Sequence, residues 1–337
     1  MHHALVIGGG GFVGRAIVDR LLARGGAVRI LGRTEQPDLR RRGVACVLGD
    51  VRNADTVRTA CRGCEVVFHT AARIGLAGPY REFHEINVRG TGNVVAACRA
   101  EGVPRLVFTS SPSVVFDGRD IEGADESLPY PPLYHAHYPE TKAHAERIVL
   151  ASNDGRLATT ALRPHLIWGP GDRHLVPRIL ARGRQGRLRR IGGVNKLIDS
   201  TYIDNCADAH LLAAERLAVG SRAAGRAYFI SNGEPIPLWE LVNGILGAGG
   251  VPPVTRDMPL WAARAAGACF EGLWSILRLR GDPPMTRFLA VELTTAHWFD
   301  LSAARRDLSY APRVSIAEGL ERLKDWLSAA GRDARGR

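Results

Sequence analysis

The chain has 337 residues, enough for one large core or two moderate ones, and its 45% hydrophobic and 23% charged residues are ordinary for a soluble globular protein. It has no secretory leader and no apolar run near the roughly 20 residues of a membrane-spanning helix, so we expect a cytoplasmic protein. Its net charge of +11 comes from dispersed arginines without interleaved aromatic residues, which favours anionic small molecules over nucleic acid as partners. The six cysteines are scattered and lack a histidine cluster, so we expect buried thiols rather than a metal site.

The chain begins with a short apolar run, a glycine-rich turn and an amphipathic stretch, which together predict strand, tight turn and helix. Gly8 allows a sharp turn, Gly11 lets the backbone approach a pyrophosphate, and Gly14 lets the helix pack close to the strand. The helix N-terminus then offers free N–H groups and a partial positive charge to phosphates. A glycine-rich turn without a ligand is the alternative. The residues expected to hold a dinucleotide here are Gly8, Gly11, Phe12, Val13 and Gly14.

A second strand is predicted over residues 27–31, and the residue type that follows it bears on the choice of cofactor. An acidic side chain there would bind the 2′-hydroxyl of the adenosine ribose, but the sequence continues Gly32-Arg33-Thr34. A guanidinium can instead form paired hydrogen bonds with a 2′-phosphate. We therefore expect NADP(H) to be preferred over NAD(H), with Arg33 as the contact, while a surface arginine is the alternative.

Strands and helices then alternate, which predicts an α/β fold of the Rossmann type with a doubly wound parallel sheet. The further strands are expected over residues 44–48, 65–69, 105–109 and 159–163, and the helices over 53–61, 83–100 and 139–151. Ligands bind such sheets at the carboxyl ends of the strands. The residues at these ends, expected to line one crevice with the glycine loop, are Asp50, Val51, Ala71, Ala72, Ser110 and Ser111.

Beyond about residue 170 the alternation loosens, with short strands over 198–203 and 227–230 and helices over 205–217 and 238–246. We expect residues 1–170 to form mainly the dinucleotide-binding domain. Residues 171–330 would form mainly a smaller substrate-binding lobe, interleaved with the first part rather than independent.

Residues 260–279 predict an amphipathic helix with two tryptophans and two charged side chains. Three readings remain open for it: a lid over an apolar pocket, a surface for a membrane or a partner protein, or plain core.

Tyr138 and Lys142 lie four residues apart at the start of the helix predicted over 139–151, so they share one face. A tyrosine hydroxyl has a reference pKa near 10, and a nearby ammonium favours the phenolate, which makes the tyrosine a better proton carrier. A serine hydroxyl can hold a substrate oxygen in place. Following a dinucleotide loop and a strand that ends in serines, this pair predicts carbonyl–alcohol redox chemistry beside a nicotinamide.

The chain resembles the extended short-chain dehydrogenases/reductases, and is most similar to their 3β-hydroxysteroid dehydrogenase-like branch. The resemblance covers nearly the whole chain. It is carried by the glycine loop and by the stretches TSSPSVVFDG at 109–118, YPETK at 138–142, LRP at 162–164 and TYIDN at 201–205. It implies that Tyr138 is the proton donor and acceptor, and that Lys142 activates it and binds the nicotinamide ribose. Ser111 would hold the substrate oxygen, with Ser110 and Ser113 as neighbouring alternatives.

The resemblance also implies roles along the cofactor. Asp50 and Val51 match the position that contacts adenine, Ala71 and Ala72 match the adenine and ribose wall, and Pro164 matches a nicotinamide contact. An ordinary structural role is the alternative for each. His135, His137 and His165 flank the site, where we expect them to pack, although pairing with a substrate carboxylate is conceivable.

Two groups within this branch resemble the chain most: the 2-alkyl-3-oxoalkanoate reductases of bacterial long-chain olefin biosynthesis, and the decarboxylating sterol-4α-carboxylate 3-dehydrogenases. Both act on a lipid-like carboxylate with a β-hydroxyl or β-keto group. The first also favours NADPH, in agreement with Arg33, so we expect reduction of a 2-alkyl-3-oxoalkanoate. The sterol reaction is the alternative, a nucleotide-sugar epimerase or dehydratase comes third, and a cofactor-binding regulator or scaffold subunit is the non-enzymatic reading. A homodimer through the helices over 83–100 and 139–151 is expected from the fold.

Overall fold

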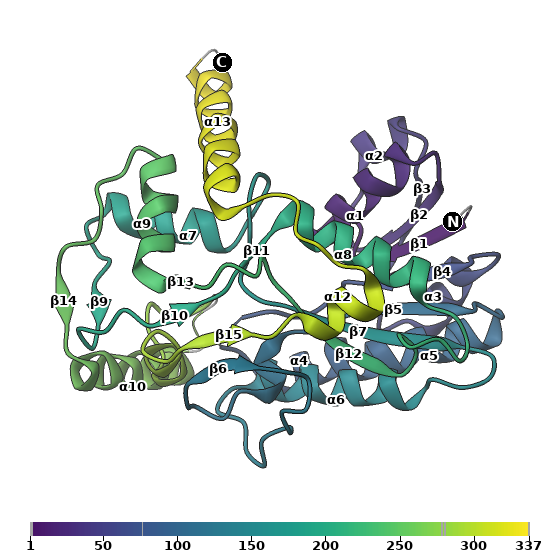
Figure 1. Ribbon diagram of the computed structural model, residues 1–337, viewed down its shortest axis with the longest axis horizontal. Coiled ribbons are helices and arrows are strands. Elements are labelled where there is room, and N and C mark those ends of the chain that lie inside the picture. Colours follow the sequence, from purple (N-terminus) through teal and green to yellow (C-terminus); the bar gives the residue numbers. More distant parts are fainter. Residues whose placement is uncertain (1–2, 76, 278, 280, 336–337) are drawn as a thin grey trace.

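The computed structural model describes residues 3–75, 77–277, 279 and 281–335. Its largest element is a sheet of seven strands in the order β12-β7-β5-β4-β1-β2-β3, all parallel (Figure 1). These strands are β1 (His3–Ile7), β2 (Ala27–Gly32), β3 (Ala45–Leu48), β4 (Val66–His69), β5 (Arg105–Thr109), β7 (Ala158–Pro164) and β12 (Arg226–Ile230). The expected Rossmann-type doubly wound sheet is therefore confirmed.

The central strands are apolar on both faces because helices cover both. In β1, Ala4 and Val6 belong to the core on one face, and Leu5 and Ile7 to the core on the other. The helices over the first face are α1 (Phe12–Ala23), α8 (Ile203–Arg216) and α12 (Ser302–Leu308), and those over the second are α3 (Ala54–Cys61), α5 (Gly90–Ala100) and α6 (His137–Ala151). A short helix, α2 (Pro37–Arg41), precedes β3.

The helix expected over 83–100 differs from the prediction in its start and its winding. It begins as α4 (Tyr80–Phe83), passes through a π-helical segment, η1 (His84–Arg89), and continues as α5. The wider π turn places Asn87 in the interior, with 2% of its surface exposed. π-Helical segments are rare in proteins, and those that do occur are often found at functional sites.

The smaller lobe has its own core, built around buried residues that include Trp168, Tyr202 and Trp239. Its helices are α7 (Leu175–Arg184), α9 (Leu238–Ala248), α10 (Leu260–Leu277), α11 (Arg287–Glu292) and α13 (Ile316–Arg335). Its small sheets comprise β13-β10-β15-β6 and the pairs β11-β8 and β14-β9, with strands β6 (Ile121–Ala124), β8 (Ile167–Trp168), β9 (Arg190–Ile191), β10 (Leu197–Ile198), β11 (Thr201–Tyr202), β13 (Ile236–Pro237), β14 (Asp257–Met258) and β15 (His297–Phe299).

The single strand expected over 198–203 is wrong. The segment divides into β10 and β11, which pair in different sheets, because the chain turns between them at the buried residues Asp199 and Ser200.

The two halves of the chain exchange elements. Strand β6, from the first half, pairs with β15 near the C-terminus. Conversely, β12 extends the large sheet beside β7, and α8 packs on the face that carries α1. Both halves therefore shape the space above the carboxyl ends of the large sheet.

Helix α10 lies at the outer edge of the smaller lobe (Figure 1). Of its residues only Ala263 and Gly267 are buried, while Trp261 is 74% exposed and Ile276 81% exposed. The plain-core reading of this segment is therefore wrong. Residue 278, within the stretch predicted as this helix, lies outside the described residues. Within the part of the chain that the structure describes, no helix has the length and apolar character needed to cross a membrane.

Candidate active site

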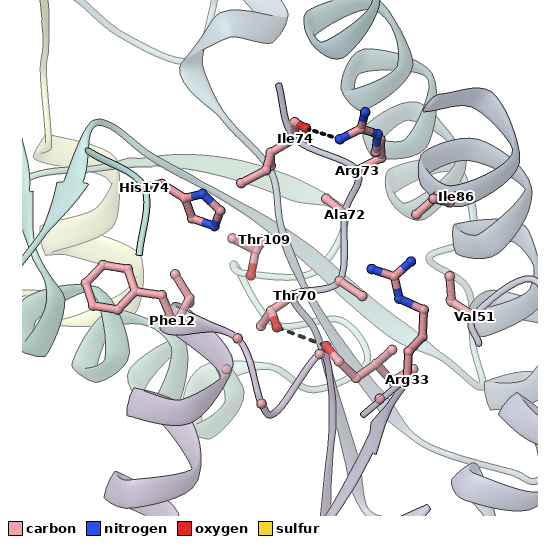
Figure 2. A pocket seen from close by; sticks show the side chains of 18 of the residues that line it. Phe12, Arg33, Val51, Thr70, Ala72, Arg73, Ile74, Ile86, Thr109 and His174 are labelled. Carbon is pink, nitrogen blue, oxygen red and sulfur yellow. Dashed lines mark hydrogen bonds between the residues drawn. The ribbon is translucent and has the colours of Figure 1, made fainter. Parts of the chain in front are cut away.

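A cleft of about 700 Å³ opens at the carboxyl ends of β1, β2, β4 and β5. Figure 2 shows Phe12 and His174 on one side of it, Arg33 and Val51 on the other, and Thr109 between them. The sequence-predicted residues that line it are Gly8, Gly11, Phe12, Val13, Gly14, Arg33, Asp50, Val51, Ala71, Ala72, Ser111, Tyr138, Lys142 and Pro164. The structure thus brings all of these residues together. Ser110 lines the cleft as well, whereas Ser113 does not.

The glycine loop fits closely between β1 and α1. Gly8 has a φ of +88°, a left-handed conformation that favours glycine, and its N–H donates to the Leu31 carbonyl at 2.8 Å. A Cβ placed on Gly14 would lie 2.2 Å from the carbonyl oxygen of Gly8, closer than real Cβ atoms approach. The loop therefore holds the first turn of α1 against the cleft, where its free N–H groups can meet phosphate oxygens.

Arg33 and Asp50 line the cleft near the ends of β2 and β3. Asp50 accepts two hydrogen bonds from the Arg52 guanidinium, at 3.0 and 2.9 Å. These bonds hold the pKa of the Asp50 carboxyl below its usual range. Burial opposes this lowering, and the positive charges of Arg52 and Arg33 add to it. Arg33 reaches into the cleft from the end of β2 (Figure 2). Its guanidinium thus lies in the cleft at the carboxyl end of β2.

Sequence reasoning missed several polar residues of the lining. Gln36 donates from Nε2 to the Thr34 hydroxyl at 3.2 Å and lies against Gly10, so this pair forms part of the wall beside Arg33. Because Thr34 and Gln36 follow β2 closely in the sequence, their positions could have indicated that they line the cleft. His174 has no such signal, because it reaches the cleft only through the packing of α7.

Asn87 fixes the wall that follows β4. Its Oδ1 accepts a hydrogen bond from the Arg73 N–H at 2.7 Å, and its Nδ2 donates to the Arg73 carbonyl at 3.1 Å. Nδ2 also lies 3.0 Å from the Thr141 hydroxyl, which is next to Lys142 in α6. One buried amide in the π turn therefore ties the cleft wall to the helix that carries Tyr138 and Lys142.

Tyr138 and Ser111 meet at the inner end of the cleft. Burial raises the pKa of Tyr138 to about 12, while a hydrogen bond with Ser111 lowers it and the charge of Glu292 raises it. Ser111 caps a short 3₁₀ helix, η2 (Pro112–Val115), and its hydroxyl lies 2.9 Å from that of Ser113. The hydrogen bond with Ser111 is thus a contact that favours the phenolate form of Tyr138.

Lys142 is buried, with 2% of its surface exposed. Its ammonium donates to the Thr109 carbonyl at 2.5 Å and stands 3.9 Å above the centre of the Phe108 ring. Burial lowers the pKa of Lys142 to about 7, and the negative charge of Glu146 opposes this shift. Burial thus weakens the preference of Lys142 for its charged form, while Glu146 supports that form.

A buried ion pair stands behind the lysine. Glu146, one turn after Lys142, accepts hydrogen bonds from Arg163 Nε and Nη2 at 3.0 and 2.6 Å. The Tyr130 hydroxyl donates to the same carboxylate at 2.7 Å. Burial would raise the pKa of Glu146, yet the bonds and charge of Arg163 keep it below its usual value. This network fixes the depth and rotation of α6.

Two histidines beneath the cleft are held neutral. The Thr91 hydroxyl donates to the Asn87 carbonyl at 2.6 Å, so it accepts from Nε2–H of His69 at 3.0 Å. His210 donates from Nδ1 to the Cys206 carbonyl, so its Nε2 accepts from the Thr109 hydroxyl at 2.8 Å. Burial lowers the pKa to about 3 for His69 and about 4 for His210. These two buried imidazoles therefore add no charge to the floor of the site.

Comparison with known proteins agrees with this geometry. Residues 5–260 match the sequence profile of the 3-beta hydroxysteroid dehydrogenase/isomerase family. A 2-alkyl-3-oxoalkanoate reductase of Stenotrophomonas maltophilia is 52% identical over 95% of this chain and 98% of its own. The decarboxylating sterol-4-alpha-carboxylate 3-dehydrogenase of Homo sapiens is 35% identical over 94% of this chain and 86% of its own.

A solved structure, MoeE5 in complex with UDP-glucose and NAD, has the same fold at a TM-score of 0.75 and 24% identity, with 97% of this chain and 99% of that chain covered. The expected family resemblance is thus confirmed by sequence over most of the chain and by fold over nearly all of it. The chain belongs to the 3-beta hydroxysteroid dehydrogenase/isomerase family, a branch of the extended short-chain dehydrogenases/reductases, and is an oxidoreductase of the type that acts on CH–OH and C=O groups.

Proposed function

We propose that this chain reduces a 2-alkyl-3-oxoalkanoate to the 2-alkyl-3-hydroxyalkanoate with NADPH. The observation that supports this most is the convergence of Ser111, Tyr138 and Lys142 at the inner end of a cleft built around the glycine loop. The substrate class comes from the Stenotrophomonas maltophilia reductase, which is similar over the whole length of both chains. The reaction is chemically reversible.

The residues present fit a dinucleotide. A Cβ on Gly8 would lie 2.9 Å from the Ala71 amide nitrogen, and one on Gly14 would meet the Gly8 carbonyl, so side chains are excluded where a pyrophosphate would approach. Asp50, Val51, Ala71 and Ala72 would border the adenosine, and Pro164 the nicotinamide.

In the proposed reaction the reduced nicotinamide supplies a hydride to the carbonyl carbon. Tyr138 gives its phenolic proton to the carbonyl oxygen, so that C=O becomes CH–OH, while Ser111 holds that oxygen by a hydrogen bond. Lys142 would hold the nicotinamide ribose, and its positive charge would stabilise the phenolate that remains after proton transfer. The ordered Ser111 hydroxyl, which caps η2, points to this residue over Ser110 and Ser113 as the oxygen ligand.

The cofactor preference rests on Arg33. No carboxylate follows β2, and Arg33, Thr34 and Gln36 line the cleft together. Arg33→Asp should shift preference from NADP(H) toward NAD(H), because a carboxylate repels the 2′-phosphate and can bind the free ribose hydroxyls. If the ratio of kcat/KM for NADPH to kcat/KM for NADH is the same in the variant as in the wild type, Arg33 does not set the cofactor preference.

The substrate class is tested by following NADPH absorbance with three compounds: a 2-alkyl-3-oxo acid, a 3-keto sterol 4α-carboxylate and a nucleotide sugar. We expect the highest kcat/KM with the 2-alkyl-3-oxo acid. Highest activity with the sterol would favour the second candidate, oxidation of a 3β-hydroxysteroid or sterol-4α-carboxylate followed by loss of CO₂, which the human relative supports. Conversion of the nucleotide sugar without net consumption of NADPH would favour an epimerase or dehydratase, and no conversion of any of the three compounds a regulator or scaffold subunit.

The outward face of α10 is proposed to contact a lipid membrane. Of its two charged residues, Glu271 pairs with Arg287 at 2.7 Å, whereas Arg264 is exposed. The outward face is apolar, carries the exposed Trp261 and Ile276, and belongs to a protein of net charge +11, which suits anionic lipid headgroups. In this arrangement the protein is cytoplasmic and peripheral to the membrane. Trp261→Ser should weaken binding to anionic vesicles, whereas unchanged binding would exclude the contact.

A homodimer through α5 and α6 completes the proposal. The helices α5 and α6 lie side by side on one face of the sheet, where they could pair with their copies in a two-fold interface. Light scattering should give a mass twice the 36.5 kDa of one chain. A monomer at micromolar concentration would contradict this assembly.

A further inference from the structure

His174 is a polar residue of the smaller lobe whose side chain reaches the cleft. Figure 2 shows its imidazole on the same side of the cleft as Phe12, opposite Arg33 and Val51. Within the part of the chain that the structure describes, neither ring nitrogen of His174 has a hydrogen-bond partner. A neutral imidazole carries a proton on one nitrogen in either tautomer, and a charged one carries a proton on both. His174 therefore offers a donor to a ligand in the cleft in either charge state.

Asp172 fixes the backbone of His174 at the start of α7. Asp172 is 5% exposed, and its Oδ1 accepts a hydrogen bond from the His174 N–H at 2.8 Å. Its Oδ2 accepts one from the Val176 N–H at 2.7 Å. Because this carboxylate satisfies N–H groups of the first turn of α7, the helix end itself has fewer donors to offer a ligand. The side chain of His174 is then the donor that this end of α7 presents to the cleft.

Arg178, one helical turn after His174, ties α7 to the segment that follows α10. Its Nη1 lies 3.7 Å from Oδ2 of Asp282, and its Nη2 donates to the Pro283 carbonyl at 3.4 Å. Oδ1 of Asp282 accepts a hydrogen bond from the Ala77 N–H at 3.3 Å, in the segment that follows β4. That segment also lines the cleft, so Asp282 joins two of its walls and restrains His174 from moving away from it.

The neighbours of His174 locate it along a bound dinucleotide. Phe12 is the first residue of α1, whose free N–H groups face the pyrophosphate in the proposed complex. Pro164, the proposed nicotinamide contact, ends β7, and Leu166 continues the cleft lining from there toward the smaller lobe. These positions place His174 on the nicotinamide side of the pyrophosphate, across the cleft from Arg33 (Figure 2).

We propose that His174 donates a hydrogen bond to the phosphate on the nicotinamide side of the pyrophosphate. This rests on the proposed function for the choice of cofactor. A phosphate carries several acceptor oxygens, so it can accept from the start of α1 and from His174 at once, and such bonds to an anion are stronger than neutral ones. The contact holds the nicotinamide half of the cofactor from the smaller lobe, which keeps the ring oriented beside Ser111 and Tyr138.

The test measures the binding of three compounds to the full-length protein by titration calorimetry. NADPH and 2′-phospho-ADP-ribose both contain the phosphate in question, whereas adenosine 2′,5′-bisphosphate lacks it. His174→Leu should weaken the binding of the first two by about 10- to 100-fold, the loss typical of a hydrogen bond to a charged group. Binding of adenosine 2′,5′-bisphosphate should be unchanged.

Two further variants separate the hydrogen bond from the shape of the side chain. His174→Gln keeps an N–H donor, so it should recover most of the affinity that His174→Leu loses. His135→Leu, the same substitution at an exposed histidine outside the cleft, should bind all three compounds as the wild type does.

Each other pattern of binding would overturn the phosphate contact. Equal weakening of all three compounds would show a structural role, and weakening of NADPH alone would show a contact with the nicotinamide. Unchanged binding of the three compounds with a raised KM for the 2-alkyl-3-oxo acid would assign His174 to the substrate. The proposed function is decided separately, by whether the wild type consumes NADPH with the acid, which these binding measurements do not require.

Discussion

Gly14→Ala tests how closely the start of α1 must approach the glycine loop. The added methyl would lie 2.2 Å from the Gly8 carbonyl oxygen and 2.9 Å from Gly9 Cα, and both are backbone atoms that cannot rotate away. Relief to an ordinary contact requires α1 to move by about 1 Å, a displacement that can cost about 100-fold in an oriented site. Because the first turn of α1 presents N–H groups to the pyrophosphate, we expect NADPH binding to weaken by roughly that factor.

The assay is titration of NADPH fluorescence with the variant and with Gly92→Ala as the matched control. Gly92 is also helical, and a Cβ there meets nothing within 4 Å, so the same substitution removes helical flexibility without a clash. Gly92→Ala should bind NADPH as the wild type does and unfold at equal or slightly higher urea. NADPH affinity in Gly14→Ala within twofold of the control would refute the reasoning.

Two further predictions concern stability. Arg163→Met leaves the Glu146 carboxylate buried without its partner, so the free energy of unfolding in urea should fall by about 3 to 5 kcal/mol. Arg119→Met, at a surface pair, should leave it unchanged, and a similar loss in both variants would contradict this account. Acidification should also destabilise the protein. Histidines in the unfolded chain bind protons near pH 6.5, whereas three buried histidines resist protonation in the folded state. Each of the three therefore lowers the free energy of unfolding by up to about 1.4 kcal/mol for every pH unit below 6.5, until its folded pKa is reached. These are His69, His210 and His297, with pKa values lowered to about 3, 4 and 3. Constant unfolding free energy between pH 7 and pH 5 would exclude this effect.

Much of the fold follows from local sequence signals. The strands of the large sheet are apolar on both faces, and the helices between them return the chain in parallel, so the doubly wound sheet could be predicted from pattern and spacing. The cleft residues also follow, because they stand at strand ends that a parallel sheet gathers along one edge.

Features that depend on contacts between distant residues escaped prediction. The apolar periodicity of 83–100 does not distinguish an α turn from the π turn that buries Asn87 against Arg73. The division of 198–203 arises because Asp199 turns toward His165, a partner 34 residues away.

The most direct test of the central claim is NADPH consumption with a 2-alkyl-3-oxo acid by the wild type and by Tyr138→Phe. We expect the wild type to form one 3-hydroxy acid for each NADPH oxidised. The variant should bind NADPH equally well and lose about 100- to 10,000-fold in kcat, because it lacks the proton that the new hydroxyl requires. Undiminished turnover by Tyr138→Phe, or no turnover of the acid by the wild type, would contradict the account.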